Sequence, residues 1–284
     1  MQQIEHGIFY ENAYPGVTVG AVIMPQGMIL VDAPLRVEDA RAWLSLLYSQ
    51  GSKSNRVLVN LDAHPDRSLG ARSMECTIIA HQKTAQVFRS RPSVFKGQNA
   101  ESGSEWETYD DMVGTRWAMP DITFTQRLTI HWGDHEAVID HHPGAAPGGT
   151  WVSIPAAKVV FVGDVVLPDQ PLFLTNADIP AWIETLDVLQ KEYRGYHIVG
   201  GRGGLVAEDA VHKQQQHLKH ILKGLERLAK RSAPVNAVED LIPGLLNDLV
   251  YDPELKETYI QRYRHGLSQY YIHRYRPSDL ITES

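Results

Sequence analysis

Cysteine is almost absent from this sequence, and so are long apolar runs. Cys76 is the single cysteine, which excludes an intrachain disulfide and any cluster of metal-binding thiolates. No run of about 18 apolar residues occurs, and the N-terminus MQQIEHGIFYENAYPG lacks a basic segment followed by an apolar one. We therefore expect a soluble, cytoplasmic protein that does not associate with membranes.

An excess of basic residues is also missing. The chain has 27 Lys and Arg against 34 Asp and Glu, which gives a net charge of −7 and a pI near 6.0. Because contacts with phosphate groups need a basic surface, this balance argues against nucleic-acid binding. With 284 residues, 43% of them hydrophobic, and no internal repeat or flexible linker, the chain can bury one large core with a helical annex.

Residues 1–207 alternate patterns that are typical of strands and helices. Strands are predicted at residues 7–12, 17–24, 28–33, 56–60, 76–80, 122–132, 135–142, 150–155, 158–164 and 196–200. Helical spacing of apolar residues predicts helices at residues 37–48, 81–88 and 182–193. Residues 90–119 are polar and have no clear pattern, and long connections of this kind often act as lids.

Residues 208–284 are almost continuously helical in pattern. Two apolar stripes run along this segment, made of Leu218, Ile221, Leu222, Leu225 and Leu228, and of Tyr259, Tyr263, Leu267 and Tyr270. Because no linker precedes it, we expect a helical extension that packs on a domain formed by residues 1–207.

The stretch NLDAHPDRSLGA, residues 60–71, follows a predicted strand and carries an altered metal-binding pattern. A strand leading into H-x-H-x-D-H indicates a dinuclear metal hydrolase. The same frame here reads Asp62, His64, Asp66 and Arg67. Taken alone, Asp-Ala-His-Pro-Asp-Arg is also an ordinary polar turn, since Asp and Pro are common turn formers.

Further segments occur in an order that resembles the metallo-β-lactamase superfamily. They are MILVDAP, NLDAHPDR, PGAAPGGTWVSIP, KVVFVGDVV and VGGRGG. The strand in the first of them ends in an early aspartate, and the resemblance spans roughly residues 5–207. The resemblance implies an α/β fold, an αββα sandwich with a metal site at one edge of two facing sheets. Here the helical segment at 208–284 would extend that fold.

The resemblance also implies positions for the metal ligands. At the three histidine positions of the first metal, this chain has Asp62, His64 and Ala145. At the aspartate and two histidine positions of the second metal, it has Asp66, Arg67 and Arg202. The aspartate that bridges both metals is retained as Asp164.

Arginine at two ligand positions disfavours a second metal. Its guanidinium stays protonated, has no lone pair to donate, and places a positive charge where a cation should bind. Three aspartates at 62, 66 and 164 bring −3, and Arg67 and Arg202 bring +2. A protonated His64 would balance the sum, so we hypothesise that a salt-bridge network replaces the dinuclear centre, with both arginines within salt-bridge distance of Asp66 or Asp164.

Other residues that could carry chemistry have plainer interpretations. His141 and His142 lie before the turn at positions that the superfamily does not use, and we expect a surface or supporting role for them. His81 is expected to pack at a helix start. The GGRGG turn lacks the spacing of a phosphate-binding loop, and Cys76 is interpreted as a small buried hydrophobic residue.

Three classes of function remain open from the sequence. The first is a protein without metal that acts as a non-catalytic or small-anion-binding module, with His64 and Asp66 as candidate acid-base residues and Arg67 and Arg202 as ligand-binding residues. The second is a hydrolase with a single Zn, Mn or Fe ion on Asp62, His64 and Asp164, whose arginines bind an anionic substrate. The third is a structural role, in which the fold and helical segment build an oligomer.

The tyrosine-rich end of the chain favours an interface or a cover over the site. We expect Tyr259, Tyr263, Tyr270 and Tyr271 either at the contact of a homodimer or at the mouth of the site.

Overall fold

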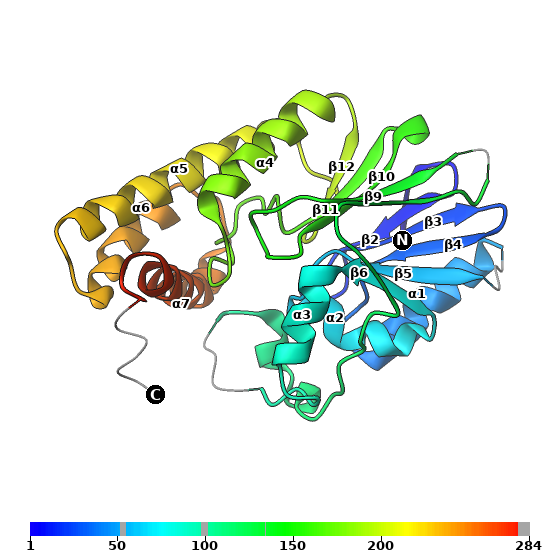
Figure 1. Cartoon of the computed structure of the whole chain (residues 1–284), viewed down its shortest axis with the longest axis horizontal. Coiled ribbons are helices and arrows are strands. Elements are labelled where there is room, and N and C mark those ends of the chain that lie inside the picture. Colours follow the sequence, from blue (N-terminus) through cyan, green and yellow to red (C-terminus); the bar gives the residue numbers. More distant parts are fainter. Residues whose placement is uncertain (52–54, 98–101, 134, 278–284) are drawn as a thin grey trace.

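Two facing β-sheets with helices on both outer sides form the body of the molecule (Figure 1). The computed structural model describes residues 1–51, 55–97, 102–133 and 135–277. The seven-stranded sheet has the order β1-β2-β3-β4-β5-β6-β7, and the five-stranded sheet has the order β12-β11-β10-β9-β8. This arrangement, with helices at the C-terminal end, confirms the predicted αββα sandwich with a helical extension.

The strands of the first sheet are β1 (Gln2–Glu5), β2 (Ile8–Glu11), β3 (Val19–Met24), β4 (Gly27–Val31), β5 (Arg56–Asn60), β6 (Thr77–His81) and β7 (Ile122–Phe124). Those of the second sheet are β8 (Arg127–Ile130), β9 (Ala137–His141), β10 (Thr150–Ile154), β11 (Val159–Gly163) and β12 (His197–Gly200). The pairs β4-β5, β5-β6, β6-β7 and β11-β12 are parallel, so the carboxyl ends of these strands meet at one edge of each sheet.

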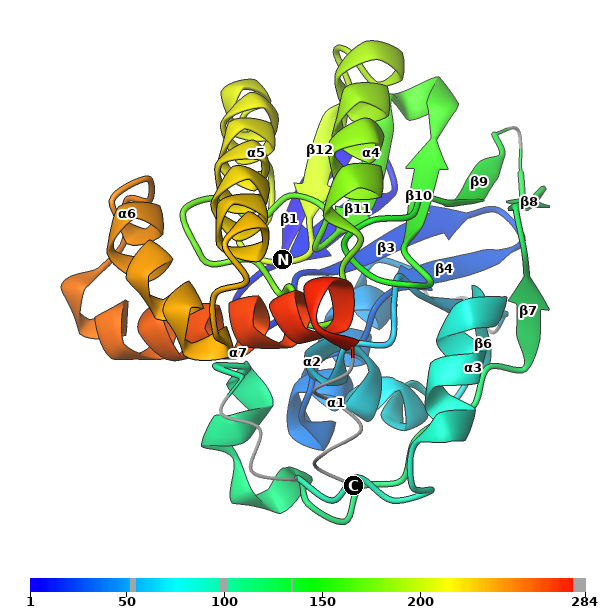
Figure 2. The same ribbon diagram turned by 60° about the vertical axis from the view of Figure 1, so that its left-hand side comes forward.

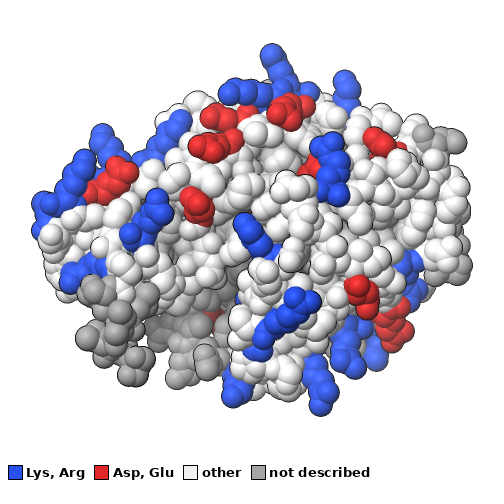
Figure 3. Space-filling view, in the orientation of Figure 1, with Lys and Arg blue, Asp and Glu red and all other residues white. Residues whose placement is uncertain are grey.

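The helices are α1 (Val37–Ser49), α2 (Pro65–Ser68), α3 (Gln82–Ser90), α4 (Ile179–Glu192), α5 (Glu208–Lys230), α6 (Ile242–Leu246) and α7 (Lys256–Tyr275). Short 3-10 turns are η1 (Leu69–Met74), η2 (Glu105–Thr108), η3 (Asp110–Met112), η4 (Pro155–Ala157), η5 (Val235–Leu241) and η6 (Pro253–Leu255). None of the helices in the described residues is long and apolar enough to cross a membrane. On the face drawn in Figure 3, basic side chains lie in several separate groups with acidic ones between them.

Strand β4 illustrates why the sandwich forms. Its residues alternate between two faces, as the two-residue period of a strand requires. Ile29 and Val31 face the core between the sheets, whereas Met28 and Leu30 pack in a second cluster with Trp43 of α1. Because both faces are covered, every residue of β4 is buried.

The predicted strand at 122–132 is two strands that belong to different sheets. β7 pairs with β6 in the first sheet, and β8 pairs with β9 in the second. The apolar alternation of Ile122 and Phe124 resumes in phase at Leu128 and Ile130, so a sequence window does not detect the break between the strands, where the chain crosses between the layers.

The helical extension is hydrogen-bonded to the segment that follows β11. Gln214 of α5 is buried, its Oε1 accepts the backbone N–H of Leu167 at 2.6 Å, and its Nε2 donates to the carbonyl of Val165. Figure 2 shows α4 and α5 side by side, with α7 running across their ends. The extension therefore borders the edge at which β11 and β12 end.

The interface predicted for the four tyrosines is wrong. Tyr259, Tyr263, Tyr270 and Tyr271 are all buried within their own chain, where they pack with the apolar stripe of α5. Tyr263 Oη lies 2.6 Å from His217 Nε2, and Tyr271 Oη donates to the carbonyl of Ala233. Helical spacing showed that these rings pack, but it did not show that α5 and α6 supply the partner surface.

Candidate functional site

Four charged side chains meet where parallel strands of the two sheets end. Asp32 directly follows β4, Asp62 follows β5, Asp164 follows β11, and Arg202 follows β12. The short helix α2, which carries Arg67, begins just after Asp62. The sequence order of the segments therefore assembles the site at one edge of the sandwich, as the resemblance implies.

Arg67 is at the centre of the cluster. Its Nη1 donates to Asp32 Oδ2 at 2.9 Å, its Nε lies 3.2 Å from Asp62 Oδ1, and its Nη2 forms an ion pair with Asp164 Oδ1. The side chain is 0% exposed. Each guanidinium nitrogen thus faces a carboxylate, and the ligand-binding role expected for Arg67 is corrected to one of holding these three carboxylates together.

Arg202 forms a second bridge. Its Nη2 lies 2.9 Å from Asp66 Oδ2, and its Nε lies 3.5 Å from Asp164 Oδ1. Its guanidinium also lies over the ring of Phe173, at 4.5 Å from the centroid. The expectation that both arginines lie within salt-bridge distance of Asp66 or Asp164 is confirmed.

Asp66 anchors a distant loop instead of facing a cavity. Its two oxygens accept the backbone N–H groups of Trp106, at 2.8 Å, and of Glu105, at 3.1 Å. Although burial opposes it, Arg202 lowers the pKa of this fully buried carboxyl below its usual value. With both oxygens engaged, Asp66 positions η2, and this geometry does not support the acid-base role that the sequence suggested.

His64 is neutral, contrary to the hypothesis that it balances the charge. Burial lowers its pKa to about 3, despite the attraction of Asp66. Its Nδ1 accepts the backbone N–H of Asp66 at 3.2 Å and lies 3.4 Å from Arg202 Nη2. Both contacts require an unprotonated Nδ1, so the ring proton is on Nε2.

A fourth carboxylate, Asp32, changes the charge balance. Burial and the neighbouring Asp62 raise the pKa of Asp32 to about 7, against the effect of Arg67. Burial also raises the pKa of Asp62, whereas Arg67 and Arg202 together lower that of Asp164 although burial opposes them. Four carboxylates therefore share two guanidinium groups, and a proton on Asp32 relieves part of the excess negative charge near pH 7.

The glycine-rich turn after β12 leaves room for this network. A Cβ atom at Gly201 would collide with Asp164 Oδ1 and Arg67 Nη2, the two partners of one ion pair. Glycine is therefore required at this position because the backbone lies too close to the ion pair for a side chain. This close approach explains one of the glycines of the GGRGG turn.

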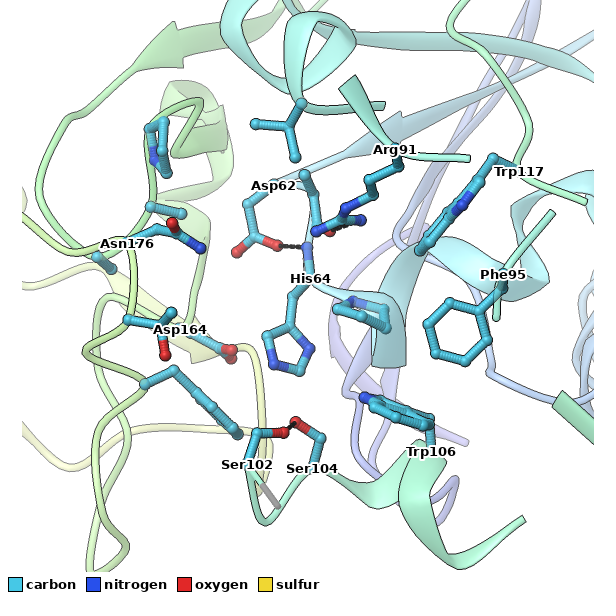
Figure 4. Close-up of a pocket in the computed structure, with 18 of the residues that line it drawn as sticks. Asp62, His64, Arg91, Phe95, Ser102, Ser104, Trp106, Trp117, Asp164 and Asn176 are labelled. Atoms are coloured by element: carbon cyan, nitrogen blue, oxygen red, sulfur yellow. Dashed lines mark hydrogen bonds between the residues drawn. The ribbon is translucent and has the colours of Figure 1, made fainter. Parts of the chain in front are cut away.

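A cavity of about 340 Å³ lies beside the network. Figure 4 shows Phe95, Trp106 and Trp117 on one side of it and Asp62, Asp164 and Asn176 on the other. The aromatic lining residues are Phe95, Trp106, Trp117, Phe173 and Trp182, and the polar ones include Asp62, His64, Asp164 and Asn176. Arg91, which follows α3, and His265 of α7 also line it. Arg67 and Arg202 are not among its lining residues.

The polar groups on the cavity wall keep some capacity for hydrogen bonds. Asp62 Oδ1 accepts the backbone N–H of His64 at 2.7 Å and faces Arg67, and Asp164 Oδ1 faces both arginines. Among the described residues, no donor contacts the Oδ2 atom of Asp62 or of Asp164. Both Oδ2 atoms can therefore accept from a ligand, and His64 Nε2 can donate.

Most of the aromatic wall was missed by sequence analysis. Trp106 and Trp117 come from the stretch at 90–119, which has no periodic pattern. Arg91 lies over the Trp117 ring at 4.7 Å and donates to the carbonyl of Ala63 at 2.9 Å, which fixes one corner of the wall. The feature of the sequence that could have indicated this wall is the presence of two tryptophans in an otherwise polar stretch.

The three histidines for which the sequence predicted no role in the site lie outside the cavity. His81 caps α3 through the backbone N–H of Lys83, and it stacks on His141 with ring centroids 3.9 Å apart. His142 stacks on Trp151 at 3.6 Å. None of the three lines the cavity.

The residues present do not fit the metal centre that the resemblance implies. Ala145 lines the cavity without offering a ligand, and Arg67 lies between the carboxylates of Asp62 and Asp164. His64 Nδ1 is taken by the backbone of Asp66. Within the described residues, no group of three or more His, Cys, Asp or Glu side chains is arranged to hold a metal ion.

Comparisons with solved structures show the same fold at low sequence identity. A metallo-beta-lactamase from Pontibacter korlensis has a TM-score of 0.61 at 16% identity, with 77% of this chain and 97% of that chain covered. The metallo-beta-lactamase DIM-1 has a TM-score of 0.58 at 14% identity, with 77% and 95% covered.

A third structure also covers the helical extension. The stereoselective inverting sec-alkylsulfatase Pisa1 from Pseudomonas sp. has a TM-score of 0.72 at 16% identity, with 98% of this chain covered. This chain spans only 51% of that protein. None of the curated proteins compared with the chain matches it. The model of the metallo-beta-lactamase superfamily matches residues 77–209 of the chain, which is thus similar to that superfamily over this segment.

Proposed function

We propose that this chain is a metallo-β-lactamase-fold protein that works without a metal and binds a small organic molecule in the cavity beside the arginine network. The observation that carries the proposal is the position of Arg67, whose three guanidinium nitrogens face the carboxylates of Asp32, Asp62 and Asp164. A divalent cation at the same carboxylates would have to lie next to a buried, permanently charged guanidinium. The network balances part of the negative charge of the aspartates and fixes their geometry in the way a metal would.

The cavity suggests the class of ligand. Its aromatic wall favours an apolar or aromatic body. The Oδ2 atoms of Asp62 and Asp164 accept hydrogen bonds, which favours a donor head group such as a primary amine. This head group differs from the anionic ligand that the sequence suggested, because the two arginines expected to bind an anion do not line this cavity.

Binding is favoured over group transfer because none of the hydroxyl groups that the described residues place on the wall is activated as a nucleophile. The hydroxyl groups of Ser102 and Ser104 lie 2.8 Å apart, and Ser102 also donates to Glu107. His64 has its unprotonated nitrogen turned to the backbone of Asp66, so it cannot activate a hydroxyl in the cavity through that atom. A homodimer and a cytoplasmic location stay predictions from the sequence.

Metal analysis tests the metal-free part of the proposal. Protein purified without chelator is expected to contain zinc, manganese and iron well below one equivalent, because Arg67 occupies the space between the carboxylates. Elemental analysis by mass spectrometry of the wild type and of Asp62→Asn checks this. One equivalent of metal that is lost in the variant would overturn the proposal in favour of a single-metal hydrolase on Asp62, His64 and Asp164.

Replacing Arg67 should destabilise the fold strongly. In Arg67→Met, three buried carboxylates lose their shared partner, and we expect the free energy of unfolding to fall by about 3 to 5 kcal/mol. The control is Arg127→Met, since Arg127 forms a two-point pair with Asp140 but is 67% exposed. That variant should change stability by about 1 kcal/mol or less. Urea unfolding of both variants measures the two losses of stability. Equal losses would contradict a central role for Arg67.

The neutral state of His64 predicts a dependence of stability on pH. Its folded pKa of about 3 lies below the ordinary histidine value of 6.5, so unfolding takes up a proton as pH falls below 6.5. Stability from this group is present above pH 6.5 and is lost as pH falls toward 3. Between pH 7 and 5 the wild type should lose about 2 kcal/mol more than His64→Asn, which keeps an acceptor for the Asp66 N–H.

Urea unfolding at both pH values measures this difference. His131→Asn, at a histidine that is 74% exposed, is the control and should keep the wild-type dependence. If His64→Asn retains the wild-type dependence as well, His64 is not held neutral by the fold.

Ligand binding can be followed by the fluorescence of Trp106 and Trp117. We expect a phenyl-bearing primary amine to bind more tightly than the matched carboxylic acid, because Asp62 and Asp164 accept hydrogen bonds. Ala145→Leu should weaken binding roughly tenfold or more, since the larger side chain takes up cavity volume. Ala156→Leu, at an exposed alanine, is the control. Tighter binding of the acid would contradict the assigned head group.

A further inference from the structure

A second cavity lies between the helical extension and the sandwich. Its volume is about 200 Å³. The residues that line it are Asn12, Tyr14, Gly16, Val17, Glu105, Gln170, Arg202, Gly203, Leu255, Thr258, Tyr259 and Arg262. They come from the β2-β3 loop, η2, the turn after β12 and α7, so this cavity exists only because α7 packs against the sandwich.

Arg262 of α7 is a buried cation that has no acidic partner in the part of the chain that the structure describes. Its side chain is 3% exposed. Its Nε and Nη2 donate to the carbonyl of Gly103, at 3.0 and 2.6 Å, and its Nη1 donates to Gln170 Oε1 at 3.1 Å. Among the described residues, no carboxylate oxygen lies within ion-pair distance of it. Neutral carbonyl groups hold the guanidinium in place but leave its charge unbalanced.

Arg202 brings a second buried cation to the same cavity. It is 6% exposed and uses Nη2 and Nε toward Asp66 and Asp164, but no described residue accepts from its Nη1. The guanidinium carbons of Arg202 and Arg262 both lie over the ring of Phe173, at 4.5 and 4.3 Å from its centroid. Both arginines line the same cavity, so two like charges border one partly desolvated space.

The remaining wall supplies neutral hydrogen-bonding groups and one carboxylate. Tyr14, Thr258 and Tyr259 have hydroxyl groups for which no described residue is a hydrogen-bond partner. Glu105 also lines the cavity. Burial, and then the nearby Arg202, lower the pKa of Arg262 to about 10, so it is still protonated at neutral pH and unfavourably placed.

We infer that this second cavity binds a small oxyanion, such as phosphate or sulfate, between Arg202 and Arg262. Guanidinium groups recognise tetrahedral oxyanions through charge-assisted hydrogen bonds, and the surrounding hydroxyl groups supply further donors. An anion would balance the buried charge that the protein itself leaves uncompensated. This site is separate from the one in the proposed function, because Arg202 and Arg262 do not line the first cavity.

Anion binding can be measured on the whole chain as a rise in melting temperature. Inorganic phosphate and, separately, inorganic sulfate are titrated at constant ionic strength with chloride as the balancing anion. Saturable stabilisation by either one is expected, because an anion that binds the folded state alone raises its stability with concentration. Absence of saturable stabilisation by both would overturn the inference.

Matched variants then locate the binding site. Arg262→Gln should weaken binding more than roughly tenfold, whereas Arg264→Gln should not change it. Arg264 lies two residues away on α7, is exposed, and pairs with Glu239, so both variants remove the same charge from the same helix. Equal affinities in the two variants would place the anion elsewhere and refute the site.

Glu105→Gln keeps the test decisive if Arg262→Gln does not fold. Removing the carboxylate from the wall takes a repelling charge away from the anion, and binding should become roughly five- to tenfold tighter. Unchanged or weaker binding by Glu105→Gln would contradict an anion in this cavity. Quenching of tryptophan fluorescence by the amine ligand of the first cavity is measured in parallel, so failure of either site is seen independently of the other.

Discussion

The guanidinium of Arg67 joins the two sheets of the sandwich at the edge where the site lies. Asp32 and Asp62 end strands of the first sheet, and Asp164 ends a strand of the second. One rigid, planar cation with several donors can satisfy three acceptors from different directions. The carboxylates can approach one another because this cation lies among them, and the backbone around Gly201 can approach because it carries no side chain.

Other parts of the site follow from this arrangement. Helix α2, which carries Arg67, is capped by His64 and also contains Asp66. Asp66 binds the backbone of η2 and thereby fixes Trp106 on the cavity wall. A charge cluster at the strand ends is thus connected to an aromatic wall about forty residues further along the chain through one carboxylate.

The sequence was sufficient for the parts of the site that lie next to strands. Arg67, Asp164 and Arg202 follow runs whose pattern is unambiguous, and the opposite charges at equivalent strand ends made their pairing predictable. Asp32 was identified only as a landmark, because its participation depends on the parallel pairing of β4 with β5. Its raised pKa depends on burial, which no local pattern encodes.

The cavity wall was not predictable in the same way. Residues 90–119 have no regular period because 3-10 turns, aromatic packing and contacts with Asp66 determine their structure, and such contacts are distant in sequence. The tyrosines of α7 show a related limit. Periodicity identified the buried face of that helix, whereas the identity of its partner, α5 within the same chain, came only from the structure.

The arginine network also makes this site difficult to convert into a dinuclear metal site by single mutations. A dinuclear centre of the kind that the resemblance implies would need changes at Asp62, Arg67, Ala145 and Arg202. Changing Arg67 alone leaves buried carboxylates uncompensated before any metal can bind, because Ala145 still offers no ligand. In the proposed metal-free state, a single change in this network therefore loses stability before it adds a metal ligand.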